Sequence, residues 1–221
     1  MLPISKKYRS DNFDDVIINV KYVVLHCMCF DDNKALEFLS SKESGVSAHY
    51  YIARDGGIFN LVDDNKKAWH AGLSSWKGQE ALNTNSIGIE LGNDGSLGAE
   101  SNYTQDQYKS LIALLNDLQA RYNIAAENII AHSDIAPDRK TDPGANFDWN
   151  KLIKNKSGIN FYKLNSSNNY LQHIVNFGYN LDYGQENVIK AFQRRFISDN
   201  ISGVLDSKTI EFINNSEIKN V

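Results

Sequence analysis

The sequence predicts an α/β fold followed by a small all-helical unit. Strand-like runs rich in Val and Ile alternate with an amphipathic helical segment at residues 104–122. The composition then becomes polar over residues 155–169, and apolar residues recur at helical spacing afterwards. We therefore expect one domain over residues 1–160 and a second, helical domain over residues 165–221. A length of 221 residues suits this division.

Composition excludes several classes of protein. Apolar residues make up 42% and charged residues 23%, as in ordinary globular chains. The net charge of −4 gives no cationic surface, so we expect neither nucleic acid nor anionic membrane as a partner. The longest apolar stretch, residues 16–30, is interrupted by Asn19, Lys21 and His26, so no membrane span is expected.

The first half of the chain reads as strand, helix and hairpin after a polar arm at residues 1–15. Residues 16–30 form a strand on which Val20, Tyr22, Val24 and His26 share one face. Residues 32–40 form a short helix that Asp32 caps. Residues 49–53 and 57–62 flank an Asp-Gly turn, the clearest hairpin signal in the chain.

Residues 68–85 lack any sustained period and read as a long loop whose Trp69 and Trp76 suit a binding wall. Residues 86–91 form a strand. Glu90 faces away from its apolar neighbours there, and is either solvated at a sheet edge or held for a function.

A capping box at residues 104–107 starts a helix to about residue 122, and a short strand at 128–132 leads into a Pro-interrupted loop. Helical spacing returns at 170–177, 186–196 and 207–213, with Gly178 and Asp206 as caps. His173 on the first of these segments is expected at the surface.

Four residues form the candidate chemical site. His132 ends a strand, and the following loop can bring Asp142 back beside it, with Lys140 two residues earlier on the same side. His26 ends another strand, and three N/O ligands leave an open position on zinc, the catalytic pattern. From the residues alone, structural histidines outweigh a metal site by about two to one, since distant ligands leave no local signature. Cys27 and Cys29 are expected to be unpaired apolar residues of the strand.

Five stretches occur in an order that resembles a known family. They are Val24-Leu25-His26, Ser47-Ala48-His49-Tyr50, Ala68-Trp69-His70-Ala71-Gly72, Leu82-Asn83 with Ser86-Ile87-Gly88-Ile89-Glu90-Leu91, and residues 132–144 (HSDIAPDRKTDPG). Together they resemble the zinc-dependent N-acetylmuramoyl-L-alanine amidases of the amidase_2 family, in particular its AmiD branch, over roughly residues 8–153.

The resemblance implies a fold, a cofactor and a reaction. The fold is a mixed central sheet flanked by helices, as in T7 lysozyme and peptidoglycan recognition proteins. One zinc ion is held by His26, His132 and Asp142, with Glu90 as general base and Lys140 stabilising the oxyanion. The reaction cleaves the amide between the lactyl group of N-acetylmuramic acid and L-Ala, in intact peptidoglycan or in anhydro-muropeptides.

Further residues follow with less support from the motifs. Trp69 and His70 are expected to line the substrate groove and Arg139 to meet a carboxylate of the stem peptide, although packing or surface roles are equally compatible. His49 is expected to be structural. Ala48 and Ala81 depart from residues found in some relatives, and the departure at Ala81 favours a specificity that includes intact peptidoglycan.

The tail resembles a second module, the peptidoglycan-binding domain 1 type. Its signature is Gly178-Tyr179, residues 188–196 (VIKAFQRRF) and Gly203-Val204-Leu205-Asp206 with Thr209. The alternative is a generic three-helix bundle whose aromatic residues only form its core.

Two rival functions are weighed against the enzyme. A non-catalytic peptidoglycan sensor on the same fold typically lacks a zinc ligand, and a phage-type lysin would share the chemistry. The substrate favours the cell envelope or periplasm. Residues 1–15 carry no signal peptide, which leaves a cytoplasmic location, another export route or a missing leader as alternatives. The sequence does not define the oligomeric state.

Overall fold

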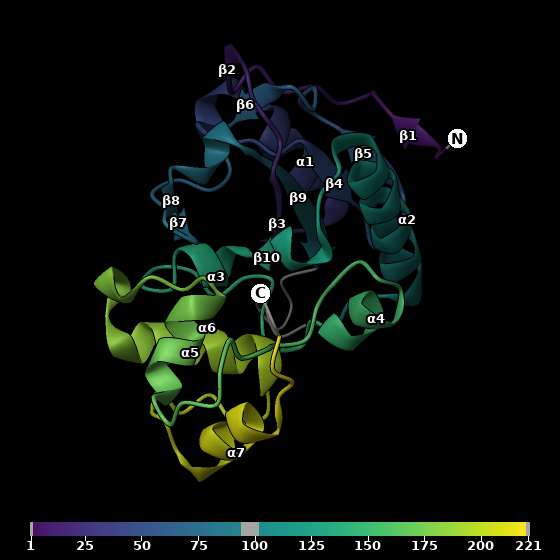
Figure 1. The fold of residues 1–221 in the computed structure, drawn as a ribbon. Helices are drawn as coiled ribbons and strands as arrows, with labels where there is room; N and C mark the ends of the chain where they lie inside the picture. Colours follow the sequence, from purple (N-terminus) through teal and green to yellow (C-terminus); the bar gives the residue numbers. More distant parts are fainter. Residues whose placement is uncertain (1, 94–101, 220–221) are drawn as a thin grey trace.

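The protein, seen in a computed structural model that describes residues 2–93 and 102–219, is built on a mixed sheet of six strands. The strands run in the order β1-β5-β4-β9-β3-β10, and all neighbours are parallel except β5 and β4 (Figure 1). The strands are β1 (Ile4–Ser5), β2 (Phe13–Ile17), β3 (Tyr22–Cys29), β4 (Tyr50–Ile52), β5 (Ile58–Asn60), β6 (Lys66–Ala68), β7 (Ser75–Trp76), β8 (Gln79–Glu80), β9 (Ser86–Asn93) and β10 (Ile129–Ala131). The helices are α1 (Asp32–Ser40), α2 (Gln105–Tyr122), α3 (His132–Ile135), α4 (Trp149–Lys154), α5 (Tyr170–Phe177), α6 (Gln185–Phe196) and α7 (Ser207–Asn215).

One face of the sheet is covered by α2 and α4. Because side chains alternate across a strand, Val23 and Leu25 of β3 point to this face together with Ile87 and Ile89 of β9. The predicted capping box is present at the start of α2, where Thr104 Oγ1 accepts from Gln107 N at 3.0 Å. The sequence prediction of a mixed sheet flanked by helices is therefore confirmed.

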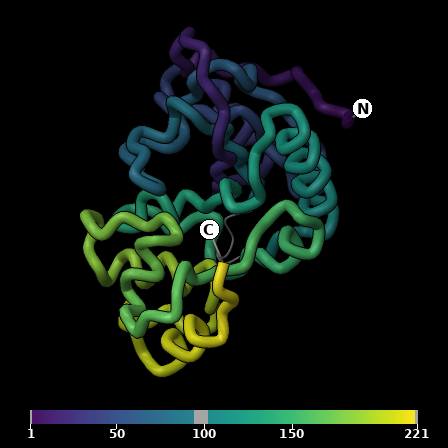
Figure 2. Tube along the Cα trace, in the orientation of Figure 1, coloured from purple at the N-terminus to yellow at the C-terminus, as the bar shows by residue number. Residues whose placement is uncertain are grey.

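The opposite face carries the C-terminal helices. Tyr22, Val24 and Ile130 of the sheet belong to one apolar cluster with Phe177 of α5 and Phe192 of α6. Figure 2 shows the light green and yellow end of the chain, which holds α5, α6 and α7, gathered against the segment that includes β10 and α3. The predicted helices at residues 170–215 thus exist, and their apolar side chains share a core with the sheet.

Several local predictions are corrected. The predicted strand at 16–30 is interrupted, so that β2 ends at Ile17 and β3 begins at Tyr22. Val20 packs with the α2 side of the sheet, because the period-two pattern does not run through this break. Asp31, not Asp32, caps α1, while Asp32 Oδ1 accepts from Tyr51 Oη at 2.7 Å.

Other corrections concern burial. Trp76 lies in the core between sheet and tail, not on a binding wall. His173 is only 2% exposed, and its Nε2 donates to Ser167 O at 2.7 Å, so it is not a surface residue. His132 begins the short helix α3 instead of ending a strand. None of the described helices combines the length and apolar character that crossing a membrane requires.

Candidate metal centre and active site

Three side chains from distant parts of the chain meet at one edge of the sheet. His26 lies near the carboxyl end of β3, and His132 directly follows the parallel neighbour β10. Parallel strands end at the same edge, so this topology brings the two imidazoles together. Asp142 arrives on the loop after α3, held there by the hydrogen bond from Ser133 N to Asp142 O at 3.0 Å.

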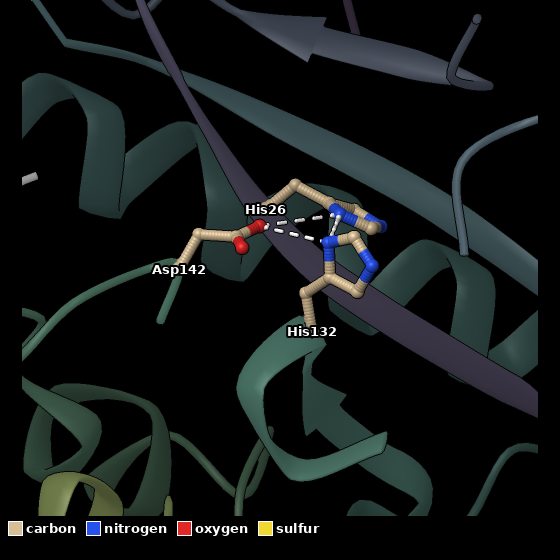
Figure 3. Close-up of side chains that lie close together, drawn as sticks. All are labelled: His26, His132 and Asp142. Atoms are coloured by element: carbon tan, nitrogen blue, oxygen red, sulfur yellow. Dashed lines mark hydrogen bonds and ion pairs between the residues drawn. The ribbon is translucent and has the colours of Figure 1, made fainter. Parts of the chain in front are cut away.

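The donor atoms of these three side chains converge (Figure 3). His26 Nδ1 lies 2.9 Å from His132 Nδ1, and Asp142 Oδ2 lies 3.1 Å from His132 Nδ1 and 3.4 Å from His26 Nδ1. Ligands about 2.05 Å from a tetrahedral zinc ion are separated from one another by about 3.3 Å. Two nitrogens and a carboxylate oxygen at this spacing fit a divalent cation with its fourth position open.

The outer nitrogens of both imidazoles are occupied in the way that a metal site requires. His132 Nε2 donates to Ala71 O at 3.2 Å, and His26 Nε2 lies 3.0 Å from His70 Nδ1. His70 Nε2 in turn lies 3.4 Å from Ser86 Oγ, whose hydroxyl donates to Leu82 O. These contacts place the protons on the outer nitrogens and leave both Nδ1 lone pairs for the metal.

Electrostatics keep two of the candidate ligands, His26 and Asp142, in their metal-binding forms. Burial, aided by the neighbouring His132, lowers the pKa of His26 to about 4, so this imidazole is neutral at pH 7. Burial opposes ionisation of Asp142, but the two imidazoles dominate and hold its pKa well below the usual range. His26 is therefore neutral and Asp142 is ionised, the forms in which each of these side chains binds a metal.

His70 is placed behind His26 by a glycine. A Cβ on Gly88 would lie 2.4 Å from the His70 ring, so only glycine on β9 leaves room for it. His49 next to it accepts from Gly88 N at 3.0 Å and donates to Lys66 O at 2.9 Å. Both contacts of His49 are to backbone, as the structural reading of this histidine expects.

Glu90 lies beside the metal ligands. It is the register partner of His26 on the neighbouring strand β9 and is only 8% exposed. Its Oε2 is buried without a hydrogen-bond partner in the described part of the chain. Burial and the Asp142 carboxylate raise the pKa of Glu90 to about 8, against the opposing effect of Lys140. Such a carboxyl group is suited to exchanging protons near neutral pH.

A cavity of about 400 Å³ opens onto these groups. Lys140 and Trp69 line it together with the three candidate metal ligands, Glu90 and His70. The structure thus brings together seven of the eight residues singled out in the sequence. Arg139 is exposed and does not line this cavity, and its Nη2 donates to the carbonyls of Ala71 and Leu73.

Sequence reasoning missed three groups that contact the candidate ligands or line the cavity. The backbone carbonyl of Ala71 orients His132, and a backbone contact of this kind is not indicated by the type of residue that makes it. Cys27 and Cys29 were predicted to be unpaired apolar strand residues; they are free thiols with Sγ atoms 3.7 Å apart, and both line the cavity. Their position at the exposed end of β3, just after His26, could have indicated that they line the cavity.

Comparisons with known proteins agree with this geometry. Residues 18–145 match the Amidase_2 family, described as N-acetylmuramoyl-L-alanine amidase. The chain is 35% identical to N-acetylmuramoyl-L-alanine amidase AmiD of Escherichia coli, over 86% of this chain and 79% of that protein. It is 47% identical to 1,6-anhydro-N-acetylmuramyl-L-alanine amidase AmpD of Citrobacter freundii, over 54% of this chain and 62% of that protein.

Solved structures extend the likeness to nearly the whole chain. The E. coli AmiD complex with anhydro-N-acetylmuramic acid-L-Ala-D-gamma-Glu-L-Lys superposes with a TM-score of 0.77 at 32% identity, covering 92% of this chain and 90% of that one. AmpDh3 of Pseudomonas aeruginosa in complex with anhydromuramic pentapeptide gives a TM-score of 0.75 at 28% identity, covering 98% of each chain. The chain therefore belongs to the Amidase_2 family of N-acetylmuramoyl-L-alanine amidases.

Proposed function

We propose that the protein is a zinc-dependent amidase that hydrolyses the bond between the lactyl carbonyl of N-acetylmuramic acid and the L-Ala nitrogen of the stem peptide. The observation that carries the proposal is the convergence of His26, His132 and Asp142 beside a buried carboxyl group, Glu90, in one cavity. Family membership supplies the reaction class, and this arrangement supplies the groups that the reaction needs.

His26, His132 and Asp142 would hold one zinc ion. Bound zinc supplies Lewis acidity and lowers the pKa of a coordinated water toward about 7. Glu90 then accepts a proton from the attacking water and delivers it to the departing alanine nitrogen. Its pKa of about 8 lets it take up and release that proton near neutral pH.

Lys140 would stabilise negative charge on the carbonyl oxygen as the tetrahedral intermediate forms. Its ammonium lines the same cavity and is close enough to oppose the pKa rise of Glu90. A fixed positive charge aimed at a developing oxyanion is worth more in a buried site than in water, because water does not screen it. Trp69, whose Nε1 donates to Asp14 Oδ1 at 3.0 Å, forms part of the groove wall.

The proposed substrates are muropeptides of two kinds. Two similar structures contain anhydromuramyl peptides, which supports anhydro-muropeptides as substrates of this chain. The departure at Ala81 supports intact peptidoglycan in addition. Because this material forms the cell wall, we propose the cell envelope as the site of action.

Mass spectrometry of reaction products tests the function. Intact sacculi and purified anhydro-muropeptides are incubated with the protein, with and without a chelator, and free stem peptides are measured. We expect stem peptides beginning with L-Ala, loss of release with chelator, and recovery with added zinc. Glu37→Gln, which changes an exposed carboxylate on α1 that does not line the cavity, serves as the control and should match the parent. Products cut at another bond would contradict the proposal.

A non-catalytic sensor is the second candidate, and the complete set of catalytic groups disfavours it. The three ligands, Glu90 and Lys140 are all present in one cavity. Binding of muropeptides with no release of stem peptide, in protein shown to contain zinc, would favour the sensor.

We further propose that the tail, residues 165–221, adds affinity for polymeric peptidoglycan. Its contact with the β7–β8 hairpin forms a groove of about 340 Å³ lined by Ser74, Asn180 and Tyr183, a mixture of polar and aromatic groups suited to a glycan or peptide. Tyr183→Ala should weaken retention on insoluble sacculi while turnover of small muropeptides stays unchanged. Ile218→Ala, an exposed position of the tail that does not line this groove, is the control. Unchanged retention of Tyr183→Ala would contradict a binding role for this groove.

A further inference from the structure

A buried carboxylate lies two residues after the metal ligand His132. Asp134 in α3 is 1% exposed, and its oxygens are fully engaged. Oδ2 accepts from Ala131 N at 2.8 Å and from Arg195 Nη1 at 2.5 Å, while Oδ1 accepts from Tyr179 Oη at 2.6 Å. Arg195 and Tyr179 both belong to the C-terminal tail. The helix that starts with a metal ligand is therefore anchored by two residues that lie 45 and 61 positions after Asp134 in the chain.

Arg195 joins the two elements on either side of His132. It lies on α6 and is only 5% exposed. Its Nη2 donates to Ile129 O in β10 at 3.0 Å, while its Nη1 reaches Asp134 in α3. The planar guanidinium suits two such acceptors at once, and it also lies 4.3 Å from the centre of the Trp149 ring. Removing one member of a buried pair leaves the other charge uncompensated, so this contact strongly restrains α3 against β10.

The tail also supports the loop whose backbone carbonyl orients His132. The residue after Phe177, Gly178, packs so closely on the Trp76 ring that a Cβ there would lie 2.6 Å from it. Lys77 N donates to Gly178 O at 2.9 Å, and the Tyr179 ring lies 4.9 Å from that of Trp76. This contact supports the loop that carries Ala71. The carbonyl of Ala71 accepts the hydrogen bond from His132 Nε2.

We propose that Arg195 and Tyr179 are positioning residues for the zinc site, acting through Asp134 on His132. The inference rests on the proposed zinc-dependent function and extends it to the tail. Zinc affinity depends on holding each ligand within about half an ångström, and partners outside the ligand set contribute about 10–100-fold to it. The C-terminal helices thus help to hold His132 in place, in addition to any role in binding the cell wall.

Point substitutions test this inference, because deleting the tail would expose the apolar face shared with the sheet. Arg195→Met and Tyr179→Phe are compared with Ile213→Ala, a fully buried change in α7 of the same apolar cluster. Zinc affinity is measured by competition with a chromophoric chelator, and the geometry of the site by the visible spectrum of the cobalt-substituted protein. Thermal unfolding of the metal-free proteins shows how much stability each change removes.

We expect Arg195→Met to lose about 10–100-fold in zinc affinity and to alter the cobalt spectrum. Tyr179→Phe keeps the aromatic ring and removes one hydrogen bond, so it should fold and lose a few-fold. Ile213→Ala should lower thermal stability but keep the parent's zinc affinity and spectrum. Folded Tyr179→Phe and Arg195→Met proteins with parental affinity and spectrum would overturn the inference. A parent protein that binds no zinc would instead refute the proposed function itself.

Discussion

Glu90→Gln should make the metal-free protein more stable while it removes activity. The folded protein holds the Glu90 carboxyl group in a nearly closed site, which raises its pKa from the usual 4.5 to about 8. A group whose folded-state pKa is raised contributes its full stability below pH 4.5 and loses it progressively as the pH rises toward 8. At pH 7 the Glu90 carboxyl group therefore lowers the stability of the folded protein. The uncharged amide of a glutamine has no such effect, because it does not ionise.

The magnitude follows from the two pKa values. From pH 4.5 to pH 7 the loss is about 1.4 kcal/mol per pH unit, or about 3 kcal/mol in total. The amide is itself a buried polar group without an assured partner, which offsets about 1 kcal/mol of this gain. A net gain of about 2 kcal/mol raises the Tm of a chain of this size by about 4–8 °C. Bound zinc favours the carboxylate, so the difference should shrink in the zinc form.

Thermal unfolding of parent and Glu90→Gln, with chelator and with zinc, measures this at pH 5, 6, 7 and 8. The stability difference between the chelated proteins should widen with pH, and turnover by the variant should fall by about 10²–10⁴-fold. Glu80→Gln, exposed and away from the cavity, should show no such trend. A constant or absent difference across this pH range would refute the claim that burial raises the pKa of Glu90 and thereby lowers the stability of the fold near neutral pH.

Three further outcomes are expected. His132→Ala should abolish zinc binding, measured by elemental analysis, because only two ligands remain; near-parental zinc content would contradict the assigned site. Lys140→Met should keep zinc but lower kcat by about 10²–10³-fold with little change in KM, since it acts on charge that forms during the reaction; a change confined to KM would point to substrate binding instead. Gly88→Ala should weaken zinc binding in chelator competition, because the new methyl group displaces His70 from behind His26; retained affinity would show that His70 is dispensable.

The sequence pointed to the three candidate metal ligands through the family motifs that mark them, and their spacing alone did not indicate a site. His26 and His132 stand 106 positions apart and meet only because β3 and β10 are parallel neighbours. Strand pairing of this kind is set by the whole fold. Glu90 was correctly placed opposite the apolar face of its strand, since alternation along a strand is local.

Other features depend on contacts that no local pattern reveals. Val20 was assigned to the wrong face because the break before Tyr22 interrupts the period of two. His173 was placed at the surface because a histidine on a helix gives no sign of the Ser167 carbonyl that it meets. The link from Asp134 to Arg195 spans 61 positions and joins regions that the sequence assigns to different domains.

The order in which the chain is synthesised gives this last contact a consequence for maturation. A nascent polypeptide that has emerged only as far as Asp142 already contains the three proposed zinc ligands, yet it still lacks the arginine that holds α3 against β10. Stable metal loading should therefore wait until α6 has left the ribosome and docked. The hydrolase would then become competent only after α6 has been translated, well after the last of its candidate ligands.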